Sequence, residues 1–354
     1  MRKLVIMAIS LMIISNVFAE IKFSGHARVR PRIDIKDDRE NGNKTTDFYY
    51  LYRGRLNISA DIGDGWFFKS SLGHNGPSYW NGKFGAGDYL PADSSITTAS
   101  RTSVDFMELY FGHKGEKCGF SAGILPLNSI GNPTIDLHFY PKYVVDIPFY
   151  IKNNDATHGF NFYKNIFDGK LEAFLTVDEN VVEITEDVTE NISKDMDTYS
   201  LGLQYSIEFA GHKIQPVFWK TFAPENEASP MTIGANFKFP ELAGFNFSLS
   251  GAYTQQNIEN ENIEKYTGYT IRPKISKDIG QGNLVAWYDL AKVTYKENNY
   301  TDFGYLWVHY KFFAYKSDLG SFYIRPTIRY HVENTPDKKD YARTRFEITT
   351  QFSF

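Results

Sequence analysis

The chain ends in Tyr341-Ala-Arg-Thr-Arg-Phe-Glu-Ile-Thr-Thr-Gln-Phe-Ser-Phe354. Its even-numbered positions are mostly apolar, whereas the odd-numbered positions carry Arg343, Arg345 and Glu347. Successive side chains of a β-strand point to opposite faces, so this alternation predicts a strand with one apolar and one charged face. Such a strand is stable where one face meets lipid and the other meets water, as in the wall of a membrane β-barrel.

The other end of the chain has the features of an export signal. Arg2 and Lys3 precede an apolar run at residues 4–14, and Val17-Phe18-Ala19 provides the small residue that a signal peptidase requires. We therefore expect residues 1–19 to be a cleaved signal peptide. Residues 20–354 are then a single exported domain.

The first segment of that domain, Ile21-Lys-Phe-Ser-Gly-His-Ala-Arg-Val-Arg-Pro-Arg-Ile33, alternates most clearly. Its odd positions are apolar or small, and its even positions include three arginines. Segments of this kind recur about sixteen times, a number within the range of outer-membrane barrels. We predict strands at residues 21–35, 47–62, 66–73, 103–113, 119–125, 156–164, 170–178, 197–209, 213–222, 230–239, 245–255, 265–277, 283–291, 300–312, 320–332 and 341–354.

The connections between these strands alternate between short and long. Short turns are expected at residues 63–65, 114–117, 165–169, 210–212, 240–244, 278–282 and 313–319. Longer polar loops are expected at residues 36–46, 74–102, 126–155, 179–196, 223–229, 256–264, 292–299 and 333–340. This pattern indicates an all-β fold, a transmembrane antiparallel up-and-down barrel with short turns at one end and long loops at the other.

The composition is compatible with such a barrel. The mean hydropathy of -0.39 would also suit a soluble all-β sandwich, but only alternate barrel residues meet lipid, and the aromatic content of 16% suits two interfacial girdles. The 38 basic and 42 acidic residues argue against a nucleic-acid partner. With Cys118 as the only cysteine, no intramolecular disulfide can form. No metal or other cofactor is expected.

Basic residues gather on the predicted inner face of four strands. Closing the barrel places the last strand beside the first, so these four strands become neighbours. Guanidinium groups remain charged and suit carboxylate and phosphate geometry, so a wall of them would attract anions. An alternative role is pairing with acidic residues such as Asp34, Asp61 and Glu347, or contact with lipopolysaccharide near the rim. The predicted pore-lining arginines are Arg28, Arg30, Arg32, Arg53, Arg55, Arg325, Arg329, Arg343 and Arg345.

Residues 126–155 form the third long loop. The segment is too long for a plain connection, and it contains four prolines and several aromatic residues. We expect this loop to pack against another part of the protein. Its Asp136 and Asp146 are candidates for an acidic side of a constriction opposite the arginines.

Signal peptide, strand number, terminal Phe354 and long third loop together resemble the trimeric porins of Gram-negative outer membranes, in which that loop folds into the lumen. The segments Tyr52-Arg-Gly-Arg-Leu-Asn-Ile-Ser-Ala-Asp-Ile-Gly-Asp-Gly-Trp66, Phe106-Met-Glu-Leu-Tyr110 and Gly123-Ile-Leu-Pro126 look like the phosphate-selective type. The last segment lacks the lysine typical of that type, and the loop carries acids, as in general diffusion porins.

The resemblance implies a channel for passive diffusion of small hydrophilic solutes and ions, with an anion- or phosphate-selective channel as the alternative. It also implies a homotrimer in contact with the lipid bilayer and lipopolysaccharide. Phe354 resembles the signal by which the outer-membrane assembly machinery recognises its clients.

Two other functions are considered. Gly119-Phe-Ser-Ala-Gly123 matches the G-x-S-x-G pattern of an enzyme, but Ser121 lies inside a predicted strand and not at a strand-to-helix turn. His26, His309 and His331 face inward by parity without metal-ligand spacing. No catalytic residue is therefore expected. A surface adhesin or solute receptor would depend on the loops at residues 74–102 and 179–196.

Overall fold

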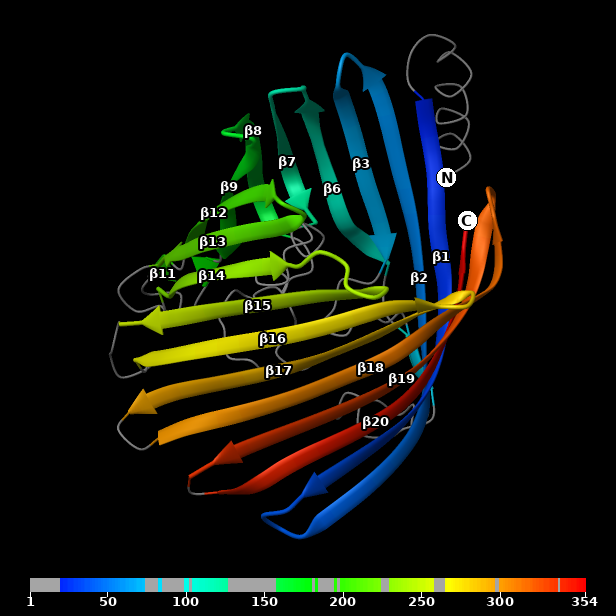
Figure 1. The fold of residues 1–354 in the computed structure, drawn as a ribbon, viewed down its shortest axis with the longest axis vertical. Helices are drawn as coiled ribbons and strands as arrows, with labels where there is room; N and C mark the ends of the chain where they lie inside the picture. Colours follow the sequence, from blue (N-terminus) through cyan, green and yellow to red (C-terminus); the bar gives the residue numbers. More distant parts are fainter. Residues whose placement is uncertain are drawn as a thin grey trace, which may run out of the picture.

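The computed structural model describes residues 20–73, 82–84, 99–101, 104–126, 157–179, 182–183, 194–195, 198–223, 229–257, 265–296, 299–336 and 338–354. In these ranges, sixteen strands form one closed antiparallel barrel (Figure 1). Among the same residues no helix is long and apolar enough to span a membrane. The predicted signal peptide and residues 127–155 of the third long loop lie outside the described residues.

The barrel strands follow each other around the ring in chain order. They are β1 (Glu20–Asp38), β2 (Asn43–Gly63), β3 (Trp66–Gly73), β6 (Asp105–Lys114), β7 (Cys118–Leu125), β8 (Thr157–Ile166), β9 (Gly169–Glu179), β12 (Thr198–Phe209), β13 (His212–Phe222), β14 (Met231–Lys238), β15 (Phe245–Gln256), β16 (Tyr266–Ile279), β17 (Gly282–Lys296), β18 (Asn299–Ser317), β19 (Gly320–Thr335) and β20 (Lys338–Ser353). Each predicted strand overlaps one of them, so the predicted fold class is confirmed.

Four short strands lie outside this ring order. β4 (Gly82–Phe84) pairs with β2 and with β5 (Ala99–Arg101). β10 (Val182–Glu183) pairs with β11 (Lys194–Asp195) in a separate two-stranded sheet.

Pairing between the first and last strands closes the barrel. Opposite residues along this seam include Arg32 and Glu347. At the end of the seam nearest the C-terminus, the Gly25 amide donates to the Phe354 carbonyl at 2.9 Å, and the Phe354 amide donates to the Gly25 carbonyl at 3.1 Å. A Cβ on residue 25 would lie 2.5 Å from the Arg55 carbonyl oxygen and 3.0 Å from the Phe354 ring. Glycine at this position therefore lets the terminal phenylalanine lie against β1.

Tight turns occupy one end of the barrel, which we call the short-turn end. Gly63, Asp64 and Gly65 join β2 to β3 with φ angles of 97°, 50° and 83°. Glycine adopts positive φ without steric cost, and Asp tolerates it better than most residues, which explains this Gly-Asp-Gly turn. The opposite end, from which the longer connections leave, is called the long-loop end.

Three of the predicted long loops are wrong in part, because strand pairing continues through them. β1 continues to Asp38 and β2 begins at Asn43. β19 continues to Thr335 and β20 begins at Lys338. Similarly, residues 292–296 belong to β17. Backbone ladder bonds do not require alternating side chains, so pairing persists where both faces are polar and the hydrophobic pattern ends.

The wall of the barrel is taller on one side. β2 has 21 residues and β18 has 19, whereas β3 and β7 have 8 each. Since a strand rises about 3.3 Å per residue, the long strands reach well beyond the short ones. The tall side runs from β16 through β20 to β2 and is clear in Figure 1.

The two faces of the wall differ as the alternation predicts. On β1, Val29 and Ile33 are 37% and 40% exposed, whereas Arg30 and Arg32, which lie between them in the sequence, are only 4% and 8% exposed. On β20 an apolar side chain is likewise on the outside of the wall, since Ile348 is 50% exposed. An exterior of exposed large apolar side chains around a polar interior is the reverse of a soluble barrel and suits a lipid environment.

We expect Ile348→Arg to weaken the barrel in lipid by about 2 kcal/mol or more, because a charge would face hydrocarbon. The free energy of unfolding in phospholipid vesicles, measured by urea titration, tests this. Ile348→Val, which keeps an apolar side chain, is the control and should change stability by about 1 kcal/mol. Equal stability of the arginine variant and the control would contradict an outward-facing position in lipid.

Candidate functional site

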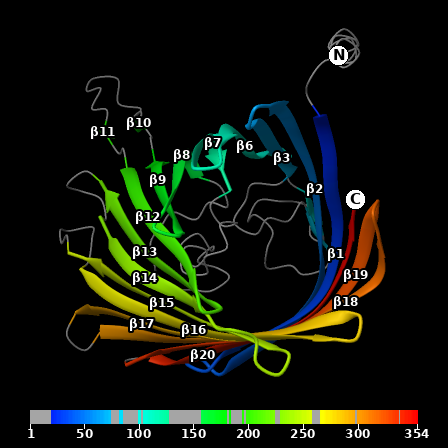
Figure 2. The same cartoon turned by 45° about the horizontal axis from the view of Figure 1, so that its top comes forward.

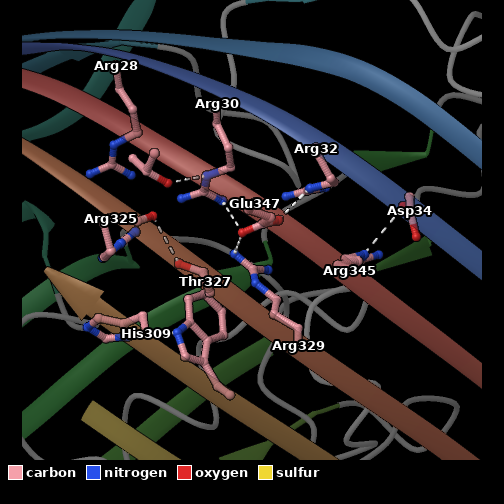
Figure 3. A network of polar contacts seen from close by, with 12 residues as sticks. Arg28, Arg30, Arg32, Asp34, His309, Arg325, Thr327, Arg329, Arg345 and Glu347 are labelled. Carbon is pink, nitrogen blue, oxygen red and sulfur yellow. Dashed lines mark hydrogen bonds and ion pairs between the residues drawn. The ribbon is translucent and has the colours of Figure 1, made fainter. Parts of the chain in front are cut away.

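The nine predicted arginines lie on β2, β1, β20 and β19, which are adjacent in the ring. We call this set the arginine face: Arg28, Arg30, Arg32, Arg53, Arg55, Arg325, Arg329, Arg343 and Arg345. Strand register determines their spacing, with Arg28 opposite Arg53 and Arg329 opposite Arg345. Seven of these residues lie on β1, β19 and β20. Those labelled in Figure 3 run from Arg28 at one end to Arg345 at the other.

Glu347 is the central counter-ion of the arginine face. Its Oε1 lies 2.5 Å from Arg32 Nε, and its Oε2 lies 2.8 Å from Arg329 Nη2 and 3.4 Å from Arg30 Nη1. The Glu347 side chain is 0% exposed. Figure 3 shows it among Arg30, Arg32 and Arg329. Three guanidinium groups from β1 and β19 therefore share one buried carboxylate, which compensates much of the cost of burying their charges.

Asp34 forms a second acidic centre toward the long-loop end. Arg343 donates from Nε to Oδ1 at 2.7 Å and from Nη2 to Oδ2, a bidentate pair, and Arg345 Nε lies 3.4 Å from Oδ2. The Tyr49 hydroxyl donates to Asp34 Oδ2 at 2.9 Å and accepts from Arg32 Nη1 at 3.0 Å. Tyr49 thus connects the Asp34 and Glu347 clusters into one network.

Toward the short-turn end, the partners of the arginines change. Arg28 Nε donates to Gln351 Oε1 at 2.7 Å, and Arg28 Nη2 lies 3.4 Å from the Tyr323 hydroxyl. Tyr323 in turn donates to Gln351 Oε1 at 2.8 Å. Arg53 Nε donates to His26 Nε2 at 3.2 Å. These acceptors are neutral amide, phenol and imidazole groups rather than carboxylates.

A column of stacked planar groups extends the site onto β16, β17 and β18. The guanidinium carbon of Arg329 lies 3.6 Å from the Trp307 ring centroid, and Trp307 stacks on Trp287 at 4.8 Å with 14° between the planes. The guanidinium carbon of Arg272 lies 5.4 Å from the Trp287 ring. Arg272 also makes a bidentate pair with the buried Asp289. Cation–π contacts and stacking hold these side chains in position.

Amide, hydroxyl and a few charged groups line the far side of the interior, where Figure 2 shows β12 and β13 across from β1 and β2. Gln204 Nε2 donates to Glu172 Oε2 at 3.0 Å, Asn236 Nδ2 donates to Gln215 Oε1 at 2.8 Å, and Ser250 Oγ donates to Asn236 Oδ1 at 2.9 Å. A cavity of about 710 Å³ opens at the short-turn end of this wall. The interior is therefore asymmetric, with guanidinium groups on one side and amides and hydroxyls on the other.

An apolar cluster also faces the interior on the far side. It consists of Leu125, Phe174, Val217 and Trp219, all buried, with Tyr110 packed against it. The Phe174 and Trp219 rings stack at 6.0 Å. These residues come from β6, β7, β9 and β13, strands that are brought together only by the closed ring.

The other predicted site residues have separate outcomes. Asp136 and Asp146 lie outside the described residues. Ser121 is inside β7, opposite Gly112 and Asn161, so the strand–turn–helix geometry of a nucleophile elbow is not formed there. The pairing predicted for Asp34 and Glu347 is present, whereas Asp61 accepts a hydrogen bond from the Gly63 amide.

Sequence reasoning missed the neutral and aromatic partners of the arginines. Trp287, Trp307, Tyr323 and Gln351 all have the inward parity of their strands, and this signal could have found them. His309 is held by Trp307, whose Nε1 donates to Nδ1 at 2.9 Å. In the described part of the chain, no group of three or more His, Cys, Asp or Glu side chains is placed to hold a metal ion.

Comparison with solved structures places this barrel among outer-membrane porins by fold. OmpT of Vibrio cholerae in its trimer form aligns with a TM-score of 0.55 at 10% identity, covering 96% of this chain and 100% of that one. An anion-selective porin from Comamonas acidovorans gives 0.55 at 11% identity, with 95% and 100% coverage. OccAB3 of Acinetobacter baumannii gives 0.51 at 11% identity, with 94% and 100% coverage. The chain has the fold of outer-membrane porins.

No family model and no curated protein matches the sequence. The structural likeness at such low identity concerns the fold, so the roles of individual residues rest on the geometry of this chain.

We expect Glu347→Gln to lower the free energy of unfolding by about 3–5 kcal/mol, because it leaves three buried guanidinium groups without their shared carboxylate. Chemical denaturation in detergent micelles measures this change. Glu208→Gln is the matched control, since the Glu208 side chain is 74% exposed and its pair with Lys213 spans 3.8 Å. If both variants unfold at the same denaturant concentration, Glu347 is not the electrostatic centre of the arginine face.

Proposed function

We propose that this protein is an outer-membrane porin, a water-filled channel for passive diffusion of small hydrophilic solutes and ions. The observation that carries the proposal is the closed barrel with an apolar exterior and a charged interior, seen in the opposite exposures of Val29 and Arg30. Only a barrel with lipid outside and water inside satisfies both faces. The porin folds of the compared structures support the same reading.

The proposed placement follows the asymmetry of the two ends. Short turns would face the periplasm and long loops the cell exterior, where lipopolysaccharide surrounds the rim. Residues 1–19 would be removed on export, and Phe354 would be recognised by the assembly machinery. The trimer form of OmpT supports a homotrimer here. The protein would have no catalytic activity.

The arginine face is the proposed lining of the permeation path. Arg53, Arg55 and Arg325 are half-buried, so their charges are accessible from the interior, whereas Arg30 and Arg32 are buried in the Glu347 network. The third long loop would narrow the lumen, with Asp136 and Asp146 on its acidic side. A basic wall opposite an acidic loop creates a transverse field that orients dipolar solutes, as expected for general diffusion.

An anion-selective channel is the second candidate. It is favoured by the arginine face itself, where the two carboxylates Asp34 and Glu347 between them contact five of the nine arginines. It would also agree with the fold match to an anion-selective porin. The two candidates differ in whether the charge of the path is balanced by the third loop.

Reversal potentials of the purified protein in planar bilayers under a KCl gradient test both candidates. We expect a stable conductance, and an anion preference if the arginine charges are not balanced by the loop. Arg53→Gln with Arg55→Gln should shift the reversal potential toward cation permeation, because two half-buried charges leave the path. Asp136→Asn with Asp146→Asn should shift it the opposite way if the loop lines the constriction.

Absence of any conductance from a barrel that shows heat-modifiable gel mobility would overturn the proposed function. A surface adhesin or solute receptor would then be favoured. A reversal potential that does not change in the arginine variant would remove the arginine face from the permeation path.

A further inference from the structure

Seven tight turns close the short-turn end, and they differ in the side chains at their tips. Four consecutive turns, from the β12–β13 turn to the β18–β19 turn, each have a large exposed apolar side chain at or beside the tip. We call these four residues the apolar rim: Phe209, 75% exposed, Leu242, 69%, Ile279, 46%, and Leu319, 89%. Phe167 in the β8–β9 turn is also exposed, but it borders the cavity at this end and is not included.

The β2–β3 and β6–β7 turns have polar tips instead. Asp64 lies between two glycines in the first turn, and Lys114, Glu116 and Lys117 are exposed in the second. A row of exposed large apolar side chains is unfavourable in water and marks a surface that contacts something less polar. The contrast between the two groups of turns therefore indicates that the two parts of this end meet different surroundings.

Two members of the apolar rim continue the outer face of the wall. Phe209 has the same parity as Leu203, which is 38% exposed on the outer side of β12. Ile279 has the same parity as Ile271, which is 42% exposed on the outer side of β16. The apolar outer surface of these strands thus extends to their last residues, without a polar margin before the turn.

The β14–β15 turn belongs to the same face. Leu242 and Phe245 exchange two backbone hydrogen bonds of 2.9 Å, and residues paired in this way have their side chains on one face. Phe245 has the parity of Leu249, which is 40% exposed on the outer side of β15. Leu242 therefore points outward, in continuity with the apolar exterior of the barrel.

Lys277 brings a cation to the level of these turns. It is opposite Phe245 in register, and its Nζ lies 4.0 Å from the Phe245 ring centroid. A Cβ built on Gly244 would lie 3.7 Å from Lys277 Cε, so the lysine side chain reaches along the wall toward the turn. Lysines that lay an aliphatic stem on apolar surface and extend the ammonium group outward are typical of a membrane boundary, where lipid phosphates lie.

The apolar rim is an arc along the wall and not a compact patch. Neighbouring strands lie about 4.8 Å apart, so the four turns span roughly 30 Å measured across the strands. Protein–protein interfaces gather their strongest apolar contacts in a buried centre. A bilayer surface instead meets a barrel along its rim, so the arrangement fits a lipid surface better than one protein partner.

We propose that the four turns of the apolar rim lie in the phospholipid headgroup layer as interfacial anchors, whereas the β2–β3 and β6–β7 turns lie in water. The proposal rests on the membrane location that is part of the proposed function. The apolar tips contact the boundary between headgroups and acyl chains, and Lys277 contacts a lipid phosphate. The two sides of the short-turn end are then held at different depths in the membrane.

Fluorescence quenching by lipid-attached nitroxides measures the depth of each turn. Cys118→Ser removes the single cysteine, and Phe209→Cys, Leu242→Cys or Leu319→Cys then provides one site for a thiol-reactive NBD fluorophore. The full-length protein is folded into phosphatidylethanolamine and phosphatidylglycerol vesicles that contain a phospholipid with a nitroxide near the headgroup. Quenching at these positions should be about threefold stronger than at the polar tips, because an interfacial side chain lies within the headgroup and acyl boundary.

Asp64→Cys and Glu116→Cys in the same background are the matched controls, because both positions are exposed turn tips at the same end of the barrel. Iodide, a quencher confined to water, should give the reverse order. Weak lipid quenching at all five positions would place the apolar rim in water and leave a protein partner as its occupant. Equally strong lipid quenching at all five would mean that the whole end is immersed. Either result overturns the proposal.

Conductance in planar bilayers separates this proposal from the channel function. If the wild type conducts and the five positions are quenched alike, the anchoring is wrong and the porin function stands. If the folded wild type does not conduct but the contrast in quenching is present, the channel function fails and the anchoring stands. Each variant is first checked for heat-modifiable gel mobility. Because the three apolar positions lie in separate turns, any one that folds decides the comparison with the controls.

Discussion

The seam between β1 and β20 is the constraint on which the site depends. Its hydrogen bonds, including the reciprocal pair between Gly25 and Phe354, join residues more than three hundred positions apart in the chain. Closure removes the two sheet edges that an open sheet would expose to lipid, where unpaired backbone groups are very costly. The same closure places the arginines of β1 beside Glu347. Without the seam, neither the Glu347 cluster nor the Asp34 cluster could form.

Once closure concentrates cations on one wall, electrostatics determines how they are arranged. Buried guanidinium groups require compensation, and Glu347 provides it for arginines of both β1 and β19, while Tyr49 connects Arg32 to Asp34. Stacking on Trp307 holds Arg329 in place. In this region five arginines share the two carboxylates Glu347 and Asp34. Arg28, nearer the short-turn end, contacts the neutral side chains of Gln351 and Tyr323 instead.

Much of the fold could be predicted because alternation is a local property. Opposite exposures of Val29 and Arg30 follow from residue order alone, once the segment is a strand in a wall between lipid and water. The sequence also predicts that the four arginine-bearing strands are neighbours, because an up-and-down barrel must join its first strand to its last. Strand lengths at the long-loop end were underestimated near Asp38 and Lys296, because backbone pairing there continues beyond the hydrophobic pattern.

The partners of each arginine could not be predicted in the same way. Parity assigns a side chain to a face but leaves its height undetermined, and height depends on the stagger between strands. Whether Arg28 meets Glu347 or Gln351 depends on the register of β1 against β20, since the two β20 residues lie four positions apart. The stack of Trp287 on Trp307 likewise needs two strands to align to within a residue.

The sequence by itself determined that this chain forms a membrane-type barrel of about sixteen strands with a basic inner face. The reason is that period-2 alternation and connection lengths depend only on the order of the residues. Only the tertiary structure decided which arginines form ion pairs with Glu347 and Asp34 and which, like Arg28, contact Tyr323. The physical reason is that Coulomb interactions and hydrogen bonds depend on distances of a few ångströms between strands, and barrel closure and register alone establish those distances.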